Sequence, residues 1–342
     1  MKKNDHIGIF TRYSRLGASS RLRAIACCES LPGATLNHLF GEKYLRKLYA
    51  TGKRPFFPAA AGMLKRFFSL FFLPRQLVIE YELLPYAPWW VEKFFLRRRR
   101  YVLDFDDAVW EKYRRIPWLR NKFRHLISHA AGVICANHFI LKEVSKYNSA
   151  VVLIPTPVDL PALPSKVVKP EVFTVGWIGT PVTFECFMKP FFPVLQQLAQ
   201  TTDYVLLVIS DGAPPEIPGV AVRFEKWDEK TQYQLLSGCH AGIMPLDNST
   251  FAAGKSGYKI IQYMAAGIVP VASPAGENSF LICDGENGML AATESEWVNK
   301  LAALAADSAL QRRLADAAGK KAGEFSLDVN RRKYQGFVKT RV

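Results

Sequence analysis

The sequence predicts an α/β fold with two domains, each built on a parallel sheet. Short apolar segments typical of strands alternate with helix-like segments along the chain, as in parallel sheets covered by helices. A proline-rich stretch, PALPSKVVKPE at 161–171, interrupts this alternation, which then starts afresh with FTVGWI at 173–178. At 342 residues, the chain is long enough for two domains with their own cores.

In the first half, apolar runs predict strands at 6–10, 76–84, 101–105 and within 151–160. The first strand leads into a glycine-containing loop and a basic helix. Gly17, with Ser19, Ser20, Arg21 and Arg23 after it, could offer donors to a phosphate, or the loop could be an ordinary strand-to-helix turn. The GxGxxG dinucleotide fingerprint is absent.

Two histidines one helical turn apart, His125 and His129, raise the question of a zinc site. They have no companion ligands, so we interpret them as ordinary helix residues. The apolar segment that follows, AAGVICAN at 130–137, is expected to continue as packed helix.

In the second half, strands followed by turns are expected within 173–183 and 203–214. A buried run at 240–246 precedes a glycine-rich loop, and a further buried strand is expected after the helix at 258–266. The last segment, FSLDVNRRKYQGFV at 325–338, is expected to form a closing helix.

The positive charge lies entirely in the first half of the chain. Residues 1–165 hold 27 Lys and Arg against 12 Asp and Glu, whereas residues 166–342 hold 18 of each. Residues 41–75 combine eight basic residues and one acid with several phenylalanines, a composition typical of interfacial membrane segments. We expect Lys65, Arg66, Phe67 and Phe68 to contact an anionic membrane or a lipid-linked acceptor. The alternative is a basic surface loop followed by a helix that packs its phenylalanines inward.

Other partners and compartments are less well supported. The basic stretch contains no recognised nucleic-acid motif, so no nucleic-acid partner is expected. No run approaches the roughly 18–20 apolar residues of a membrane-spanning helix, and no signal peptide is evident. The six cysteines show no CxxC or disulfide-framework spacing. We therefore expect a cytoplasmic protein, peripheral at the inner face of a membrane.

An acidic cluster, DFDDAVW at 104–110, follows a predicted strand, where open α/β sheets bind ligands. Asp106 or Asp107 could hydrogen bond a substrate hydroxyl or act as a base, and either could equally cap the next helix. No companion ligands support a metal ion, and no metal or other cofactor is expected.

The most informative segment is GKSGYKIIQYMAAGIVPVASPAG at 254–276. Its loop of Gly254, Lys255, Ser256 and Gly257 opens directly onto a predicted helix, Tyr258–Ala266. Flexible backbone N–H groups at a helix N-terminus, together with a lysine, are suited to holding a diphosphate.

This segment resembles the signature region of family 4 retaining glycosyltransferases of the GT-B fold. Members usually read Glu-Gly-Phe-Gly, a helix ending Glu-Ala-Met-Ala-x-Gly, then Pro-Val-Val-Ala-Ser. The two glutamates of that pattern are replaced here by Gly254 and Gln262, and the arginine usual after the first strand of the second domain is missing. We associate the GK-x-G-x-K pattern with a branch of the same family that lacks the two glutamates.

The resemblance implies a set of donor-binding residues. These are Gly17, Gly179, Thr180, Asp211, Trp227, Gly254, Lys255, Ser256, Gly257, Tyr258, Lys259 and Gln262. Lys255 would also act in catalysis, by stabilising the departing diphosphate. Asp106 and Asp107 are the other catalytic candidates, as groups that hydrogen bond a substrate hydroxyl or act as a base.

The resemblance also implies two Rossmann-like domains facing across a cleft, at 1–162 and 163–325, with a helix at 326–342 that crosses back. The implied activity is a metal-independent hexosyltransferase moving sugar from a nucleotide-sugar to a glycan or lipid-linked acceptor, in cell-surface polysaccharide or lipopolysaccharide assembly. A non-catalytic scaffold and a sugar-nucleotide epimerase remain open as alternatives.

Overall fold

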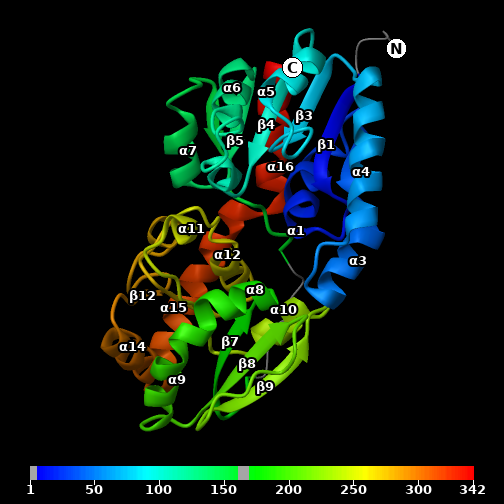
Figure 1. Ribbon diagram of the computed structural model, residues 1–342. Helices are drawn as coiled ribbons and strands as arrows, with labels where there is room; N and C mark the ends of the chain where they lie inside the picture. The colour runs from blue at the N-terminus through cyan, green and yellow to red at the C-terminus, as the bar shows by residue number, and fades with distance from the viewer. Residues whose placement is uncertain (1–5, 161–168) are drawn as a thin grey trace. The chain divides into compact units, whose positions relative to one another are not determined.

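The computed structural model describes residues 6–160 and 169–342, and the chain divides into two compact units (Figure 1). Among the described residues, unit 1 comprises those up to Pro157 with Gly254–Ser256 and Leu327–Val342. Unit 2 comprises Val158–Ala253 and Gly257–Ser326. The predicted boundary at 162/163 lies outside the described residues.

Unit 1 is built on a six-stranded parallel sheet in the order β2-β1-β3-β4-β5-β6. The strands are β1 (Ile7–Tyr13), β2 (Thr35–Phe40), β3 (Gln76–Glu80), β4 (Arg100–Phe105), β5 (Gly132–Cys135) and β6 (Val151–Leu153). Leu77, Val78 and Ile79 of β3 are completely buried, as expected for a central strand with helices on both faces.

Two of these strands were not predicted from the sequence. The expectation that 130–137 is helical is wrong, because Gly132–Cys135 forms β5 between β4 and β6. This short apolar run is buried on both faces, where a strand and a helix segment have the same pattern. β2 lies at the edge of the sheet, and its exposed, mixed-polarity residues give no clear alternation.

Helices and short 3-10 or π segments connect the strands of unit 1. They are α1 (Ala18–Ser20), α2 (Ala26–Cys28), α3 (Glu42–Thr51), α4 (Phe56–Ser69), α5 (Trp89–Leu96), α6 (Lys122–His129), α7 (His138–Val144) and, in addition, Arg21–Ile25, Leu70–Phe72 and Val109–Tyr113. His125 and His129 lie on α6, and the Trp89 ring stacks on His125.

The last helix, α16 (Leu327–Arg341), also belongs to unit 1. Its Tyr334 hydroxyl donates to Asp104 Oδ2 at 2.9 Å, and Arg331 Nε donates to the Ala26 carbonyl at 3.1 Å. Asp104 in turn accepts from the buried Arg23 guanidinium at 2.7 Å. This helix therefore completes the core of unit 1 from the far end of the chain.

Unit 2 holds a second six-stranded parallel sheet, in the order β12-β11-β10-β7-β8-β9. The strands are β7 (Phe173–Ile178), β8 (Tyr204–Ser210), β9 (Ala221–Lys226), β10 (Ala241–Met244), β11 (Val269–Ala272) and β12 (Met289–Leu290). The helices are α8 (Pro181–Thr183), α9 (Phe192–Ala199), α10 (Gln232–Ser237), α11 (Thr250–Ala253), α12 (Tyr258–Ala265), α13 (Asn278–Leu281), α14 (Glu294–Ala306) and α15 (Ser308–Ala322), with short segments at Phe184–Met188, Lys189–Phe191 and Gly323–Phe325.

The predicted α/β class with two parallel sheets is confirmed in the described residues. Each sheet reverses its strand order once, between β1 and β3 in unit 1 and between β7 and β10 in unit 2. Open α/β sheets bind ligands beyond the carboxyl ends of the strands at such a reversal. The loops after β1, β3, β7 and β10 are therefore the first places to look for a site.

Candidate functional site

The turn after β7 lies at the strand reversal of unit 2 and brings together Trp177, Gly179 and Lys259. The Lys259 ammonium lies 4.3 Å from the Trp177 ring centroid. A Cβ added to Gly179 would be 2.8 Å from Lys259 Nζ and 2.7 Å from the Trp177 ring, so only glycine fits in this turn. The turn thus receives a cation from α12, although its own residues include neither lysine nor arginine.

The start of α12 depends on a second glycine. Gly257 has a φ of 66°, which glycine adopts without strain, and a Cβ there would be 2.5 Å from Leu281 Cδ1. Glu277 packs against the same position, with its Cβ and Cγ at 3.3 and 3.4 Å from that Cβ, and it is buried. Sequence reasoning did not single out this carboxylate, although Glu277 directly follows the segment 254–276.

Five polar side chains form a cluster between α10, α12 and the end of β9, and three of them were predicted from the sequence. Gln262 Nε2 and Trp227 Nε1 both donate to Oε1 of Gln232, each at 3.2 Å. Burial raises the pKa of Tyr233 to about 12, and its hydrogen bonds with Tyr258 and Gln262 oppose that rise. The structure thus joins the predicted Trp227, Tyr258 and Gln262, and adds two α10 residues that were missed. Their QYQ pattern, at 232–234, was the available signal.

The remaining predicted residues of unit 2 lie at strand ends without contributing to this cluster. Thr180 is exposed and caps the short α8, with its Oγ1 accepting from Thr183 N at 3.4 Å. Asp211 is exposed after β8, and burial of part of its carboxyl raises its pKa while Lys226 opposes the shift.

Gly254, Lys255 and Ser256 group with unit 1. The Gly254 carbonyl accepts from Asn137 Nδ2 at 2.9 Å. Asn137 is completely buried and also caps α7, where its Oδ1 accepts from Ile140 N at 2.7 Å. The functional roles predicted for the three loop residues stay predictions.

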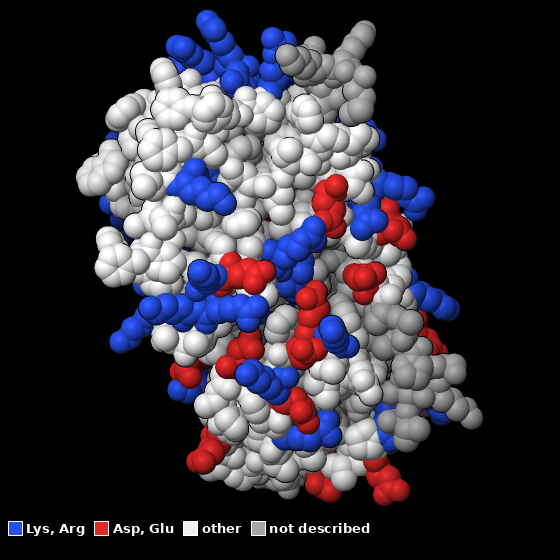
Figure 2. All heavy atoms as spheres, turned by 90° about the vertical axis from the view of Figure 1, so that its right-hand side faces the viewer, with Lys and Arg blue, Asp and Glu red and all other residues white. Residues whose placement is uncertain are grey.

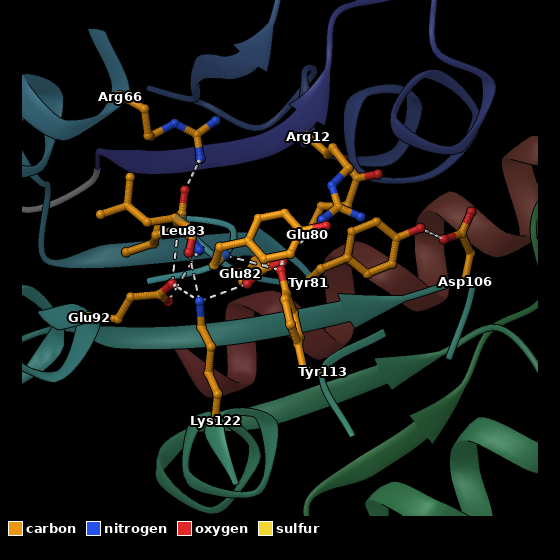
Figure 3. A network of polar contacts seen from close by, with 12 residues as sticks. Arg12, Arg66, Glu80, Tyr81, Glu82, Leu83, Glu92, Asp106, Tyr113 and Lys122 are labelled. Atoms are coloured by element: carbon orange, nitrogen blue, oxygen red, sulfur yellow. Dashed lines mark hydrogen bonds and ion pairs between the residues drawn. The ribbon is translucent and has the colours of Figure 1, made fainter. Parts of the chain in front are cut away.

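The strand reversal of unit 1 carries a buried network of charged side chains that the sequence did not reveal (Figure 3). Lys122 Nζ lies 2.7 Å from Glu82 Oε2 and 2.8 Å from Glu92 Oε1, and all three side chains are buried. Glu82 also accepts from the Tyr113 hydroxyl at 2.8 Å and from Arg12 Nη2 at 3.0 Å. Each buried charge therefore has a hydrogen-bonded partner of opposite sign.

Asp106 lies beside this network, after β4. Its Oδ1 accepts a hydrogen bond from the Tyr81 hydroxyl (Figure 3). Burial, with the charges of Asp107 and Glu80 nearby, raises the pKa of Asp106 to about 8, and Arg23 opposes this shift. Asp106 is consequently protonated in much of the population at neutral pH. A protonated carboxyl can donate a hydrogen bond as well as accept one.

The loop after β1 offers less to a ligand than expected. The Gly17 N–H donates to the Ser14 carbonyl at 2.9 Å, and the Ser20 hydroxyl donates to Glu80 at 2.5 Å. The suggestion that Ser20 and Arg23 face a phosphate is wrong, because Arg23 is buried against Asp104 and Ser20 against Glu80. The donor-binding role of Gly17 stays a prediction.

Arg66 is also not where the sequence suggested. The expectation that it faces a membrane is wrong, because its guanidinium is buried and donates to backbone carbonyls of Thr11, Asn37 and Leu83 at 2.7–3.1 Å. Its neighbours on α4, Lys65, Phe67 and Phe68, are exposed.

No group of three or more His, Cys, Asp or Glu side chains in the described parts of the chain is placed to hold a metal ion. Over the same residues, no helix is long and apolar enough to cross a bilayer.

The two parallel sheets, each with a polar cluster at its strand reversal, define a two-sheet α/β fold of the Rossmann-like class. Residues 169–307, a range that includes β7 through α14, match the family model described as glycosyl transferases group 1. No curated protein matches the sequence.

Solved structures share the architecture over nearly the whole chain. HepE of Anabaena in complex with UDP has a TM-score of 0.70 at 14% identity, with 98% of this chain and 100% of HepE covered. A glycosyltransferase from Rickettsia africae has a TM-score of 0.67 at 13% identity, with 98% of each chain covered. The lipopolysaccharide outer core galactosyltransferase WaaB, in its apo form, has a TM-score of 0.63 at 12% identity, with 98% and 100% covered.

These similarities establish the GT-B fold. With the match over 169–307, they make this chain glycosyltransferase-like.

Proposed function

We propose that the protein is a retaining, metal-independent hexosyltransferase that moves a sugar from a nucleotide-sugar to a glycan or lipid-linked acceptor. The observation that carries this proposal is the arrangement at the strand reversal of unit 2. There, the Lys259 ammonium at the Gly179 turn lies on the same helix as Gln262, which contacts Gln232. HepE, a structural neighbour, was solved with UDP and with UDP-glucose, which supports a nucleotide-sugar as donor.

Each group has a chemical task in this proposal. Lys259 and Lys255 neutralise the diphosphate, whose negative charge grows as the glycosidic C1–O bond breaks. Gln262 hydrogen bonds the ribose, and Trp227 lines the base. The acceptor hydroxyl bonds to C1 on the face that the diphosphate leaves, and its proton passes to the departing phosphate oxygen. No enzyme nucleophile is needed, so the missing glutamate pair does not exclude turnover.

We further propose that the protein works at the inner face of an anionic membrane, in cell-surface polysaccharide or lipopolysaccharide assembly. The similarity to WaaB supports such a pathway. The surface of α4 supports the location, because the helix turns an apolar stripe toward solvent: Phe57 is 83% exposed and Phe72, just beyond its end, is 85% exposed, with Leu64 and Phe68 exposed between them. Soluble proteins rarely expose apolar side chains in such a continuous row.

α5 extends this apolar surface. Phe95, partly buried on α5, contacts Phe67 and Phe71, with ring centroids at 6.0 and 5.3 Å. On the same helix, Trp90 is 72% exposed and the guanidinium of Arg97 lies 5.1 Å from the ring centroid of the exposed Phe94. We call the exposed set the aromatic face; it comprises Phe57, Leu64, Phe67, Phe68, Phe71, Phe72, Trp90 and Phe94.

Charged side chains are sparse over this part of unit 1, and Lys and Arg gather near its edge (Figure 2). An apolar centre with a cationic rim matches the layering of an anionic bilayer surface, where aromatic rings insert and cations stay at the headgroups.

A ligand screen tests the proposed activity. Thermal unfolding is followed with UDP, GDP, ADP, CMP and the corresponding nucleotide-sugars. The proposal predicts stabilisation by nucleotides of one base, followed by release of that nucleoside diphosphate when an acceptor is added. A folded protein that no nucleotide stabilises would contradict it and favour a non-catalytic scaffold. A converted nucleotide-sugar in the absence of any acceptor would favour an epimerase.

A further inference from the structure

The loop Tyr81–Tyr86, which follows β3 at the strand reversal of unit 1, has an unusual backbone. Tyr81 and Tyr86, at its two ends, have φ values of 63° and 62°, a region that non-glycine residues rarely occupy. The Glu82 N–H donates across Tyr81 to the Glu80 carbonyl at 2.8 Å, closing a three-residue turn. Such conformations persist only where surrounding contacts hold them, and they concentrate at functional sites.

Buried charged groups supply those contacts. Glu92 accepts from the backbone N–H groups of Leu83 and Leu84 at 3.2 and 3.0 Å. Lys122 donates to the Leu84 carbonyl at 2.7 Å, and Arg66 donates to the Leu83 carbonyl at 3.1 Å. Three buried charged side chains thus fix the centre of the loop by hydrogen bonds to its backbone, whereas an ordinary surface turn needs no such contacts.

The first residue of this loop, Tyr81, contacts two charged side chains. Its hydroxyl donates a hydrogen bond to Asp106, and the guanidinium carbon of Arg12 lies 5.1 Å from the centroid of its ring. Arg12 is itself fixed by two hydrogen bonds. Its backbone N–H donates to the Glu80 carboxylate at 2.8 Å, and its guanidinium donates to the Glu82 carboxylate at 3.0 Å. Both the backbone and the ring of Tyr81 are therefore fixed before any substrate binds (Figure 3).

We propose that Tyr81 is a positioning residue, whose hydroxyl and constrained backbone hold the Asp106 carboxyl in one orientation at the carboxyl edge of the unit 1 sheet. One part of this proposal rests on the proposed function: that Asp106 hydrogen bonds a sugar or acceptor hydroxyl during transfer. The coupling between the two side chains stands independently of it.

The charged surroundings of Asp106 make the coupling measurable. Asp107 on its own loop and Glu80 at the end of β3 disfavour the ionised carboxyl, while Arg23 beside β4 favours it. The Tyr81 hydroxyl adds one donor to the carboxylate, which also favours ionisation. Removing that hydroxyl should therefore raise the pKa of Asp106 further.

The experiment follows the Asp106 carboxyl by ¹³C NMR titration, with the resonance assigned by its loss in Asp106→Asn. Tyr81→Phe should move the midpoint upward by about one pH unit. Tyr86→Phe is the matched control, with the same change on a residue of the same loop and similar φ, and it should leave the midpoint unchanged. Tyr81→Asn, which tolerates a positive φ but lacks the phenol, should shift the midpoint like Tyr81→Phe.

An Asp106 midpoint in folded Tyr81→Phe equal to that of the wild type would overturn the proposal. In the transfer assay, Tyr81→Phe should lower kcat by about tenfold and move the corresponding limb of the pH–rate profile by the same amount as the NMR midpoint. A lower kcat with an unmoved profile would show a structural effect only, and would also overturn it. If no nucleotide binds the wild type, the proposed function fails, and the titration still decides whether Tyr81 controls Asp106.

Discussion

Lys259 brings an ammonium group to the end of β7, although the turn itself contains no basic residue. The sequence indicated a missing cation there, because spacing along the chain cannot reveal that a side chain from α12 reaches the Gly179 turn. Glu277 was missed for the same reason, since it reaches the start of α12 from a separate loop.

At the residue scale, Lys255 tests the predicted diphosphate contact. Lys255→Ala should lower kcat about 100-fold without loss of folding, because a preorganised positive charge on the leaving group is removed. Steady-state kinetics and a thermal melt check this. The control is Lys189→Ala, which removes an exposed lysine that pairs with Glu185 on the protein surface. Activity of the Lys255 variant within a few-fold of the parent would remove this residue from the site.

Asp106 predicts a pH dependence of stability. Its pKa in the folded protein, about 8, lies above the roughly 3.9 of an unfolded chain. Between these two values the folded state holds a proton that the unfolded state has lost, so this group makes the protein less stable as pH rises. Relative to Asp106→Asn, the wild type should therefore lose stability from pH 4 to pH 8. Denaturant unfolding of both proteins at intervals across this range measures it; a constant difference would refute the raised pKa.

At the scale of single elements, α4 carries one basic residue that is buried and structural, and neighbouring residues that are exposed. The sequence placed Lys65, Arg66, Phe67 and Phe68 on one membrane-facing surface, but helical geometry turns Arg66 inward. Periodicity alone could not show this, because a helix with an exposed apolar stripe has the same pattern as one with a buried stripe. The contribution of α5 to the aromatic face was likewise visible only once Phe95 was seen between the two helices.

The buried guanidinium gives a stability prediction. Arg66→Met should lower the free energy of unfolding by about 3 kcal/mol, because it removes the charged donor that bonds the carbonyls of Thr11, Asn37 and Leu83. Lys65→Met, one residue earlier and exposed, should change it by less than about 0.5 kcal/mol. Urea unfolding compares them, and equal effects of the two substitutions would contradict the structural role of Arg66.

The aromatic face gives a binding prediction. Phe68→Ser with Phe72→Ser should weaken partitioning onto vesicles of phosphatidylcholine and phosphatidylserine at least tenfold, since two insertable rings are lost. Phe280→Ser, the same change at an exposed phenylalanine of unit 2, is the control. Co-sedimentation measures both. Partitioning unchanged in the double variant would exclude these rings from membrane contact, and a concentration-dependent dimer lost in it would favour a second copy as the partner.

At the scale of the whole molecule, the sequence predicted the α/β class and the strands that line both strand reversals. Those strands are apolar runs bounded by loops, so their pattern is clear. It did not predict the strands β2, β5, β9 and β12. It also did not predict the buried network of Glu82, Glu92 and Lys122, because charged side chains give no sequence signal that distinguishes a buried ion pair from a solvated surface. The networks at the two reversals belong to different units, so their contributions can be measured separately.

The central claim is that unit 2 holds the nucleotide of the donor at the ends of β7 and α12. Hydrogen–deuterium exchange, with and without the nucleotide selected by the thermal screen, tests it most directly. The account predicts slower exchange in peptides covering 173–180, 227–233 and 257–263, and no such change in Lys259→Ala at the same nucleotide concentration. Protection confined to other segments, with these peptides unaffected, would contradict it.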